Sequence, residues 1–438
     1  MPSNKKTVGI FTLGCKVNQY ESEAIAEQLQ RAGFEILPPS SKCDAYVINT
    51  CTVTAESDRK ARQFIRRAIS QNPDAIVAVT GCMAQTAVEQ VASIEGVDAV
   101  VGNTDKLRTA TLVEQLLHKG EKCATPQIYV SDINEAAFEQ MSITHFERTR
   151  AYVKIEDGCE SRCTYCIIPA ARGKIRSKPH AQVLDEVRTL TENGCREIVL
   201  TGIETASYGK DLQDTDLATL LCDIDAVEGI GRIRLGSLDP SLIKRDFVER
   251  IAPLRSLAPH FHLSLQSGSS HVLALMKRKY NARQAMDAIK LLREYIPDVK
   301  FTTDVIVGFP GESESDFEQT VGFVREAGFL RAHIFPYSKR AGTPAAQMPE
   351  QISKQEKSRR LHVLSEVESQ SRERILRDEL ERSPIKEVLF ETWRDGYACG
   401  HTADFLEVKA PSPRPLHATL AKVRLTEADG DVLLGELI

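Results

Sequence analysis

The chain has 438 residues, of which 42% are hydrophobic and 27% charged, a composition typical of a soluble globular protein with a real core. Its length corresponds to about two to four domains. With 61 acidic against 56 basic residues, the net charge is −5. The chain as a whole therefore does not attract nucleic acid, and any RNA contact must depend on local basic patches.

The eleven cysteines are an odd number spread over a long chain, which indicates metal binding in a reducing compartment and not a disulfide framework. No signal peptide precedes the first predicted strand. No run approaches the roughly 18 apolar residues of a membrane helix. We therefore expect a cytoplasmic protein without a membrane partner.

Residues 1–125 alternate strand-like and helix-like segments and form the first predicted domain. Strands are expected at 8–13, 45–49, 75–80 and 97–101, and helices at 18–32, at 58–70 and from about residue 85. Asn18 and Glu21 have the spacing of a capping box at the start of the first helix. This alternation predicts a parallel sheet with helices on both faces.

One cysteine follows each of the first three strands: Cys15 in TLGCKVNQ, Cys51 in VINTCTV and Cys82 in VTGCMAQ. The carboxyl ends of parallel strands share one edge, where ligands of open α/β folds bind, so we expect the fold to bring these thiols together. Ordinary buried cysteines are the alternative, but those would lie within the strands. The placement favours an iron–sulfur cluster.

A denser motif, C-x3-C-x2-C, follows the predicted strand at 152–155 and comprises Cys159, Cys163 and Cys166. An iron–sulfur cubane ordinarily has one thiolate per iron, so three ligands leave one iron open. A zinc knuckle would need a second pair of ligands at short range, and three buried thiols would not be expected in a polar loop. The spacing therefore predicts a cluster with a vacant position, which is the arrangement of a metal site that does chemistry.

The cysteine loop and its flanks, KIEDGCESRCTYCIIPAARGKIRS, resemble the signature of radical S-adenosylmethionine (SAM) enzymes and, among them, of the methylthiotransferases. The segments TLGCKVNQYES, NTCTVT and GCMAQ are similar to the N-terminal motifs of that family. The resemblance implies that SAM binds the open iron of a 4Fe–4S cluster in the central loop and is cleaved to a 5′-deoxyadenosyl radical. It also implies an auxiliary 4Fe–4S cluster on the three N-terminal cysteines, whose sulfur a second SAM methylates.

From about residue 152 to 337 the chain repeats strand and helix roughly six times, within a second predicted domain at 145–372. This predicts a partial (β/α)6 barrel, the fold that the resemblance also implies, with its site at the carboxyl ends of the strands. The loops there are rich in Gly and small polar residues, which let the backbone approach a ligand. Turn chemistry alone is the alternative for any one loop, but as a set they favour a SAM pocket. The candidate SAM contacts are Glu204, Arg234, Ser237, Gln266 and Gly308.

A charged helical stretch at 354–380 leads to the third predicted domain, 375–438, whose short strands predict a small antiparallel β-barrel. It resembles the TRAM domain that ends methylthiotransferases, with GYACGHTADFLEV similar to the central motif of that domain. Asp404 stands where the family often has Asn, and the segment is acidic, so strong phosphate binding by this domain is not expected. The predicted fold class is α/β throughout the first two domains.

Several functions remain open at this point. The segments LTGIETASYGKD and CTYCIIPAARGKIRSKP resemble the branch that methylthiolates carbon 2 of threonylcarbamoyladenosine at tRNA position 37, with SAM as radical source and methyl donor. Isopentenyladenosine in tRNA and a ribosomal protein aspartate are the alternative substrates. A two-cluster electron carrier or redox sensor is the non-enzyme alternative, which open irons disfavour. The resemblance implies three partners: a tRNA anticodon stem–loop, a one-electron donor of flavodoxin or ferredoxin type, and a sulfur source.

Two basic elements are candidates for RNA contact. The helix at 58–70 carries basic residues that can equally form a solvated face: Arg59, Lys60, Arg62, Arg66 and Arg67. The other element is a run after the cysteine loop: Arg172, Lys174, Arg176 and Lys178. Because substrate must pass beside the central cluster, we expect Arg172 and Lys174 to contact phosphate groups.

Overall fold

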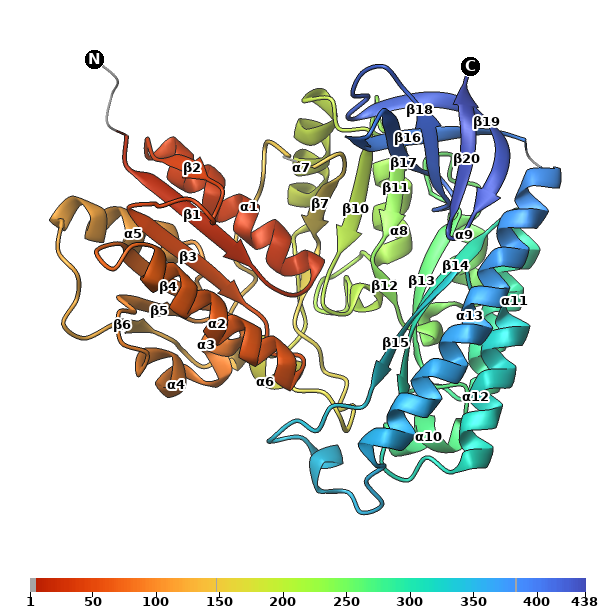
Figure 1. Cartoon of the computed structure of the whole chain (residues 1–438), viewed down its shortest axis with the longest axis horizontal. Helices are drawn as coiled ribbons and strands as arrows, with labels where there is room; N and C mark the ends of the chain where they lie inside the picture. Colours follow the sequence, from red (N-terminus) through yellow and green to blue (C-terminus); the bar gives the residue numbers. More distant parts are fainter. Residues whose placement is uncertain (1–4, 147, 383) are drawn as a thin grey trace.

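The computed structural model describes residues 5–146, 148–382 and 384–438. These residues form three parts in chain order: an N-terminal α/β unit, a central set of parallel strands with helices outside it, and a C-terminal β-barrel (Figure 1). The predicted fold class is confirmed. Among the described residues, no helix is long and apolar enough to cross a membrane.

The N-terminal part is a six-stranded parallel sheet in the order β2-β1-β3-β4-β5-β6 within the described residues. Its strands are β1 Thr7–Thr12, β2 Glu35–Leu37, β3 Ala45–Thr50, β4 Ile76–Gly81, β5 Ala99–Val101 and β6 Gln127–Tyr129. Its helices are α1 Lys16–Arg31, α2 Ala55–Gln71, α3 Cys82–Thr86, α4 Val88–Ala92 and α5 Arg108–Lys119. Strand β3 is buried on both sides: Ala45 and Val47 pack with α1 and α5, whereas Tyr46 and Ile48 pack with α2, α3 and α4. The sixth strand lies beyond residue 125, where sequence placed the end of this domain.

The predicted capping box at the start of α1 is wrong. The helix begins at Lys16, and the residue before it is Cys15. The Asn18 side chain instead donates to the backbone oxygens of Leu13 at 2.6 Å and of Thr50 at 2.9 Å, and so joins the ends of two strands. Glu21, which sequence placed in the capping box, is buried among cations.

The central part has two parallel sheets that continue one another, because only Gly236 separates β11 from β12. The first sheet contains β7 Ala151–Lys154, β10 Glu197–Thr201 and β11 Arg232–Leu235. The second contains β12 Ser237–Leu238, β13 His260–Gln266, β14 Lys300–Val307 and β15 Arg331–Pro336. This open arrangement of parallel strands confirms the predicted partial barrel.

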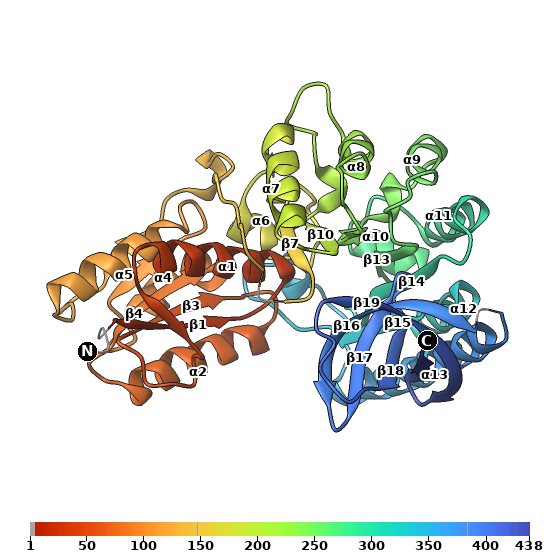
Figure 2. The same ribbon diagram turned by 90° about the horizontal axis from the view of Figure 1, so that it is seen from above.

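Helices cover the outer side of these strands. The longer ones are α7 His180–Glu192, α8 Leu217–Asp225, α9 Arg245–Ile251, α11 Ala282–Tyr295 and α12 Glu314–Ala327. The short ones are α6 Ile168–Arg172, α10 Ser270–Leu275 and the 3-10 turns at Ile133–Glu135, Thr205–Ser207, Pro240–Leu242 and Pro344–Gln347. Seen from above, α7, α8, α9 and α11 lie on one side of the strands, and the N-terminal sheet and C-terminal barrel lie on the other (Figure 2). One face of each strand therefore packs in the core, and the alternate residues face the other two parts.

The C-terminal barrel follows a long helix, α13 Lys354–Arg382, which runs through the predicted domain boundary near residue 372. Its strands are β16 Ile385–Arg394, β17 Tyr397–Thr402, β18 Glu407–Pro411, β19 Thr419–Asp429 and β20 Val432–Leu437. The barrel closes in the order β16-β17-β18-β20-β19. Pairing is antiparallel, as predicted, except between β18 and β20, which pair in parallel.

The C-terminal barrel contacts the central strands where they begin. The Arg232 guanidinium forms an ion pair with Glu387 at 2.9 Å. Phe405, held at a φ of +73°, stacks on His260 with ring centroids 4.4 Å apart. Sites in such barrels lie at the carboxyl ends of the strands. The C-terminal barrel contacts the opposite ends, so it does not cover the ends where the cysteine loop lies.

Candidate functional site

The three N-terminal cysteines lie at the carboxyl ends of adjacent strands. Cys15 follows β1, Cys51 follows β3, and Cys82 begins α3 directly after β4. Burial, with smaller contributions from the neighbouring thiols of Cys82 and Cys15, raises the pKa of Cys51 to about 11. A Cβ atom added to Gly14 would lie 2.8 Å from Sγ of Cys51, which shows how closely the two loops approach. The convergence predicted from the strand ends is present.

A buried charge cluster, which we define as Glu21, Lys106, Lys154, Asp157, Arg172 and Arg176, adjoins these thiols. Four cations in it share two carboxylates. The pKa of Glu21 is held well below its usual range against the effect of burial, chiefly by Arg172 and Lys106. Nε of Arg172 donates to Sγ of Cys82 at 3.3 Å. The surplus of positive charge suits an anionic group held by thiolates.

The described residues contain no group of three or more His, Cys, Asp or Glu side chains arranged around a single metal ion. Because burial raises the pKa of Cys15 and of Cys51, a cluster bound by these thiols would have to displace their protons.

The central cysteine loop is fixed by a short antiparallel ladder between β8 Glu156–Asp157 and β9 Arg176–Ser177. Gly158 turns the chain there with a φ of +88°, and a Cβ atom on it would lie 1.9 Å from the backbone oxygen of Lys174. Within the loop, the Cys159 N–H donates to the Gly173 oxygen at 2.9 Å, and the Cys166 N–H donates to the Cys163 oxygen at 3.1 Å. These bonds hold the three thiols in a compact turn.

Polar groups point at the central thiols. Backbone N–H groups of Ser161 and Ile168 donate to Sγ of Cys159 and Cys166, both at 3.4 Å. Nη1 of Arg278 donates to Sγ of Cys163 at 3.3 Å. Sequence analysis missed Arg278, because it stands in the run KRKY, which is indistinguishable from a solvated surface.

The five candidate SAM contacts are not brought to one place. Glu204 lies beside the loop, with Oε2 3.2 Å from Sγ of Cys159, and its other oxygen is 3.5 Å from Nζ of Lys279. Gln266 ends β13 at a φ of +69°, next to residues whose backbone oxygens bind Arg278 and Tyr280. Ser237 is exposed just after β11.

Arg234 and Gly308 have other surroundings than a SAM pocket. The Arg234 guanidinium lies over the ring of Phe405, 4.9 Å from its centroid, and so is directed toward the C-terminal barrel. Gly308 has a φ of +70°, its N–H donates to Glu312, and a Cβ atom on it would lie 2.3 Å from the Lys357 side chain. The glycine is thus required by its backbone conformation and by the crossing of α13.

The structure contradicts one predicted RNA contact. Arg172 is fully buried, and its guanidinium is bonded to Asn18, Glu21, Asp157 and Cys82, so it cannot meet a phosphate group. The physical reason is that the fold supplies buried carboxylates from distant segments, which a basic run in the sequence does not reveal. Two further basic residues of the run are also buried: Arg176 and Lys178. Lys174 is exposed, and its RNA contact stays a prediction.

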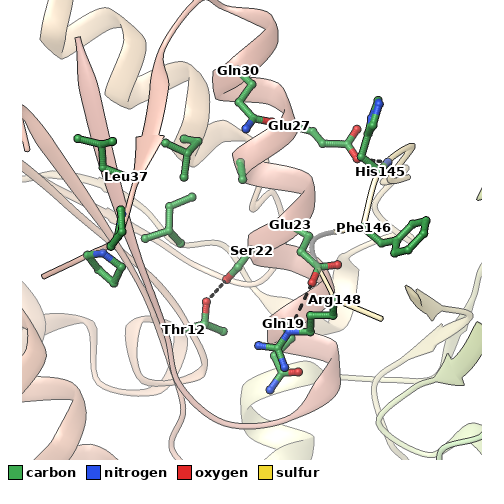
Figure 3. Close-up of a pocket in the computed structure, with 15 residues that line it drawn as sticks. Thr12, Gln19, Ser22, Glu23, Glu27, Gln30, Leu37, His145, Phe146 and Arg148 are labelled. Atoms are coloured by element: carbon green, nitrogen blue, oxygen red, sulfur yellow. Dashed lines mark hydrogen bonds and ion pairs between the residues drawn. The ribbon is translucent and has the colours of Figure 1, made fainter. Parts of the chain in front are cut away.

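A cavity of about 710 Å³ lies elsewhere, between α1, β1 and β2 and the residues His145, Phe146 and Arg148 (Figure 3). Nε of Arg148 is 3.9 Å from Oε1 of Glu23 on its wall. The cavity opens on the face of α1 that is lined by Gln19, Glu23 and Glu27, and the six cysteines of the two sets do not line it. It is therefore distinct from the cysteine site.

Comparisons with known proteins agree with this geometry. The Radical SAM superfamily profile matches residues 153–324, and the profile described as Uncharacterized protein family UPF0004 matches residues 7–102. Threonylcarbamoyladenosine tRNA methylthiotransferase MtaB of Bacillus subtilis is 41% identical over 96% of this chain and 94% of its own length. The tRNA-2-methylthio-N(6)-dimethylallyladenosine synthase of Carboxydothermus hydrogenoformans is 34% identical over 99% of this chain and 100% of its own length.

Among solved structures, the radical SAM methyltransferase TsrM of Kitasatospora setae matches with a TM-score of 0.57 and 15% identity, covering 78% of this chain and 77% of that chain. At this identity the likeness shows the fold alone. The sequence matches to these relatives, in contrast, extend over nearly the whole chain. The chain therefore belongs to the radical SAM methylthiotransferase family.

Proposed function

We propose that this protein methylthiolates carbon 2 of threonylcarbamoyladenosine at position 37 of tRNA, beside the anticodon. The observation that carries the reaction type is the meeting of the two cysteine sets at one interface: Arg172, six residues after Cys166, bonds Sγ of Cys82. For the substrate, the relative named for threonylcarbamoyladenosine is 41% identical to the chain, against 34% for the relative named for dimethylallyladenosine.

The cofactors of the family are two 4Fe–4S clusters and SAM. The residues present fit them, because each set offers three thiols with a positively charged arginine bonded to one of them. We assign the auxiliary cluster to Cys15, Cys51 and Cys82, and the SAM-binding cluster to Cys159, Cys163 and Cys166. When bound, these groups supply the electron that cleaves SAM and the sulfur that is methylated.

The chain's own residues then position SAM and hold charge. The Glu204 carboxylate, at the mouth of the central loop, suits the positively charged amino group of SAM, and Ser237 and Gln266 offer further polar contacts at the strand ends. Arg278 and Arg172 place one buried cation at each set of thiolates. A cation there stabilises thiolate ligands, which are otherwise costly to bury.

The substrate base must leave its stack to reach this buried site. An anticodon loop, with unpaired bases, makes this inexpensive. We assign phosphate contact to Lys174 and to the basic residues of α2, of which all but Arg62 are exposed: Arg59, Lys60, Arg66 and Arg67. A one-electron donor of flavodoxin or ferredoxin type and a sulfur source complete the reaction, in a cytoplasm where thiols stay reduced.

Nucleoside mass spectrometry of anticodon stem–loop RNA, incubated with reconstituted protein, SAM and a reductant, tests this function. We expect a methylthio product from RNA that carries threonylcarbamoyladenosine and none from RNA that carries isopentenyladenosine. The opposite preference would show that isopentenyladenosine is the substrate, in agreement with the name of the relative that is 34% identical. A matched variant in which Cys15, Cys51 and Cys82 are all alanine should still cleave SAM but give no product.

A further inference from the structure

The inner face of the central strands, turned away from the outer helices, is lined with charged and polar side chains. Along β10, Ile198 and Leu200 enter the outer core, whereas Glu197 lies on the opposite face. The same alternation places Arg234 on β11 and Asp304 on β14 on this inner face, since their sequence neighbours Ile233, Leu235 and Val305 are core residues. Apolar burial does not explain charges at these positions.

Arg234 has donors without partners. Its side chain is 3% exposed, and Nε donates to Glu197 at 2.7 Å. Nη1 and Nη2, however, have no hydrogen-bond partner among the described residues. Leaving buried donors of a charged group unsatisfied is costly, so this guanidinium is arranged to receive an acceptor from outside the chain.

Lys16 is a second cation with unbonded donors. It follows Cys15 directly, at the first position of α1, where α1 meets the central part (Figure 1). Its side chain is accessible to solvent, and within the described residues its ammonium has no ion pair or hydrogen bond. Although the side chain is accessible, the surrounding protein partly desolvates its ammonium; this desolvation, followed by Arg234 and Arg150, lowers the pKa of Lys16, whereas Asp304 and Glu197 raise it. Further along the same helix, Glu21 bonds Nζ of Lys154 on the inner face of β7 at 3.0 Å, so the start of α1 lies against the inner face of the central strands.

The nearby carboxylates are already committed. Glu197 binds Arg150 and Arg234, both at 2.7 Å. Asp304 lies 3.2 Å from Nε2 of His262. Arg234 keeps two unbonded Nη donors and Lys16 has no ion pair among the described residues, so an anion that reached both would satisfy these donors and reduce the repulsion between the two cations.

We propose that Lys16 and Arg234 bind the carboxylate of the threonyl group in the substrate nucleoside. This deepens the proposed function and rests on it. A threonylcarbamoyl group carries a carboxylate, whereas an isopentenyl group is an uncharged hydrocarbon, so the pair selects between the two substrates of the family. The planar guanidinium offers two N–H groups to a carboxylate. Because Lys16 adjoins Cys15, binding here also fixes the nucleoside beside the N-terminal cysteines.

A thermodynamic cycle between protein and RNA tests this inference. The reconstituted protein is titrated with two anticodon stem–loops, one with threonylcarbamoyladenosine and one in which the threonyl carboxylate is a neutral carboxamide. We expect the wild type to bind the carboxylate RNA about 10- to 100-fold more tightly, the range of charge-assisted hydrogen bonds. Lys16→Met and Arg234→Met should lose most of this preference and bind the carboxamide RNA as the wild type does.

Lys16→Met keeps the test independent of folding, since this side chain is accessible whereas Arg234 is buried. Lys119→Met, at the exposed end of α5, is the matched control and should keep the full preference. Equal loss of affinity for both RNAs in Lys16→Met and Arg234→Met would overturn the inference, because it would mean a phosphate or structural role.

The two proposals fail in different ways. If the wild type methylthiolates the carboxylate RNA but binds both RNAs equally, only the carboxylate site is wrong. If it gives no product with threonylcarbamoyladenosine RNA, the proposed function is wrong and this inference falls with it.

Discussion

Replacing Arg172 by methionine should destabilise the junction of the first two parts and not weaken RNA binding directly. The guanidinium donates to Asn18 at 2.5 Å, to Glu21 at 2.6 and 3.1 Å, to Asp157 at 3.1 Å and to Sγ of Cys82 at 3.3 Å. Asn18, Glu21 and Cys82 belong to the N-terminal part, and Asp157 belongs to the central part. One side chain therefore ties the two together.

The size of the effect follows from the charges that remain. Breaking a buried ion pair by removing one partner costs about 3–5 kcal/mol. In the variant, Glu21 keeps Lys106 and Lys154, and Asp157 keeps Lys154. Arg172 also lowers the pKa of Lys106, after the larger effect of burial, so its removal relieves some repulsion. We therefore expect the lower end, about 3 kcal/mol, which is roughly a 100-fold change in the unfolding equilibrium.

Urea denaturation followed by far-UV circular dichroism, with iron content as a second readout, measures this loss. The matched control is Lys174→Met, two residues along the chain and exposed, which should change stability by less than about 0.5 kcal/mol. The reasoning would be refuted if Arg172→Met unfolded at the wild-type midpoint, kept its iron and lost tRNA affinity, since that pattern belongs to a surface phosphate contact.

Three further predictions follow from local geometry. Gly14→Ala should lose the auxiliary cluster, and with it about half of the bound iron, because the new Cβ would lie 2.8 Å from Sγ of Cys51. The control Gly33→Ala, with a similar φ of +95° and no atom within 4 Å of the new Cβ, should keep all of its iron. Iron analysis of both variants measures the difference. Arg278→Met should make the reduction potential of the central cluster more negative and slow SAM cleavage, because the Arg278 cation beside the Cys163 thiolate stabilises the reduced cluster. An unchanged potential in spectroelectrochemistry would contradict this. Burial, and then Arg234, holds the pKa of His260 well below its usual range. The contribution of His260 to stability is therefore present above its unfolded-state pKa and is lost as the pH falls below that value, by about 1.4 kcal/mol per pH unit at most. Between pH 7 and 5.5 the stability of His260→Phe should vary less than that of the wild type, and an unchanged slope would speak against this.

Most of the fold was predictable because its signals are local. The buried strands β1, β3 and β4 are short apolar runs, and the helices between them have an apolar face, so alternation alone specifies a parallel sheet. Cysteines placed just after such strands must then share one edge. The capping box at Asn18 failed for the opposite reason: its side chain bonds the Leu13 and Thr50 oxygens, one of them on a different strand.

The sequence by itself determined the two cysteine sets, the parallel strands that carry them and the family to which the chain belongs, because spacing along one segment encodes each of these. Only the tertiary structure decided what each charged residue does. The basic run after the cysteine loop looks like an RNA contact, yet Arg172 is buried because Glu21 and Asp157 meet it from two different parts of the chain. Arg234 and Lys16 are 218 positions apart, and it is the fold that lays the helix of Lys16 against the strand face that carries Arg234. Electrostatic energies depend on distance in space and on burial, and neither can be read from the order of residues.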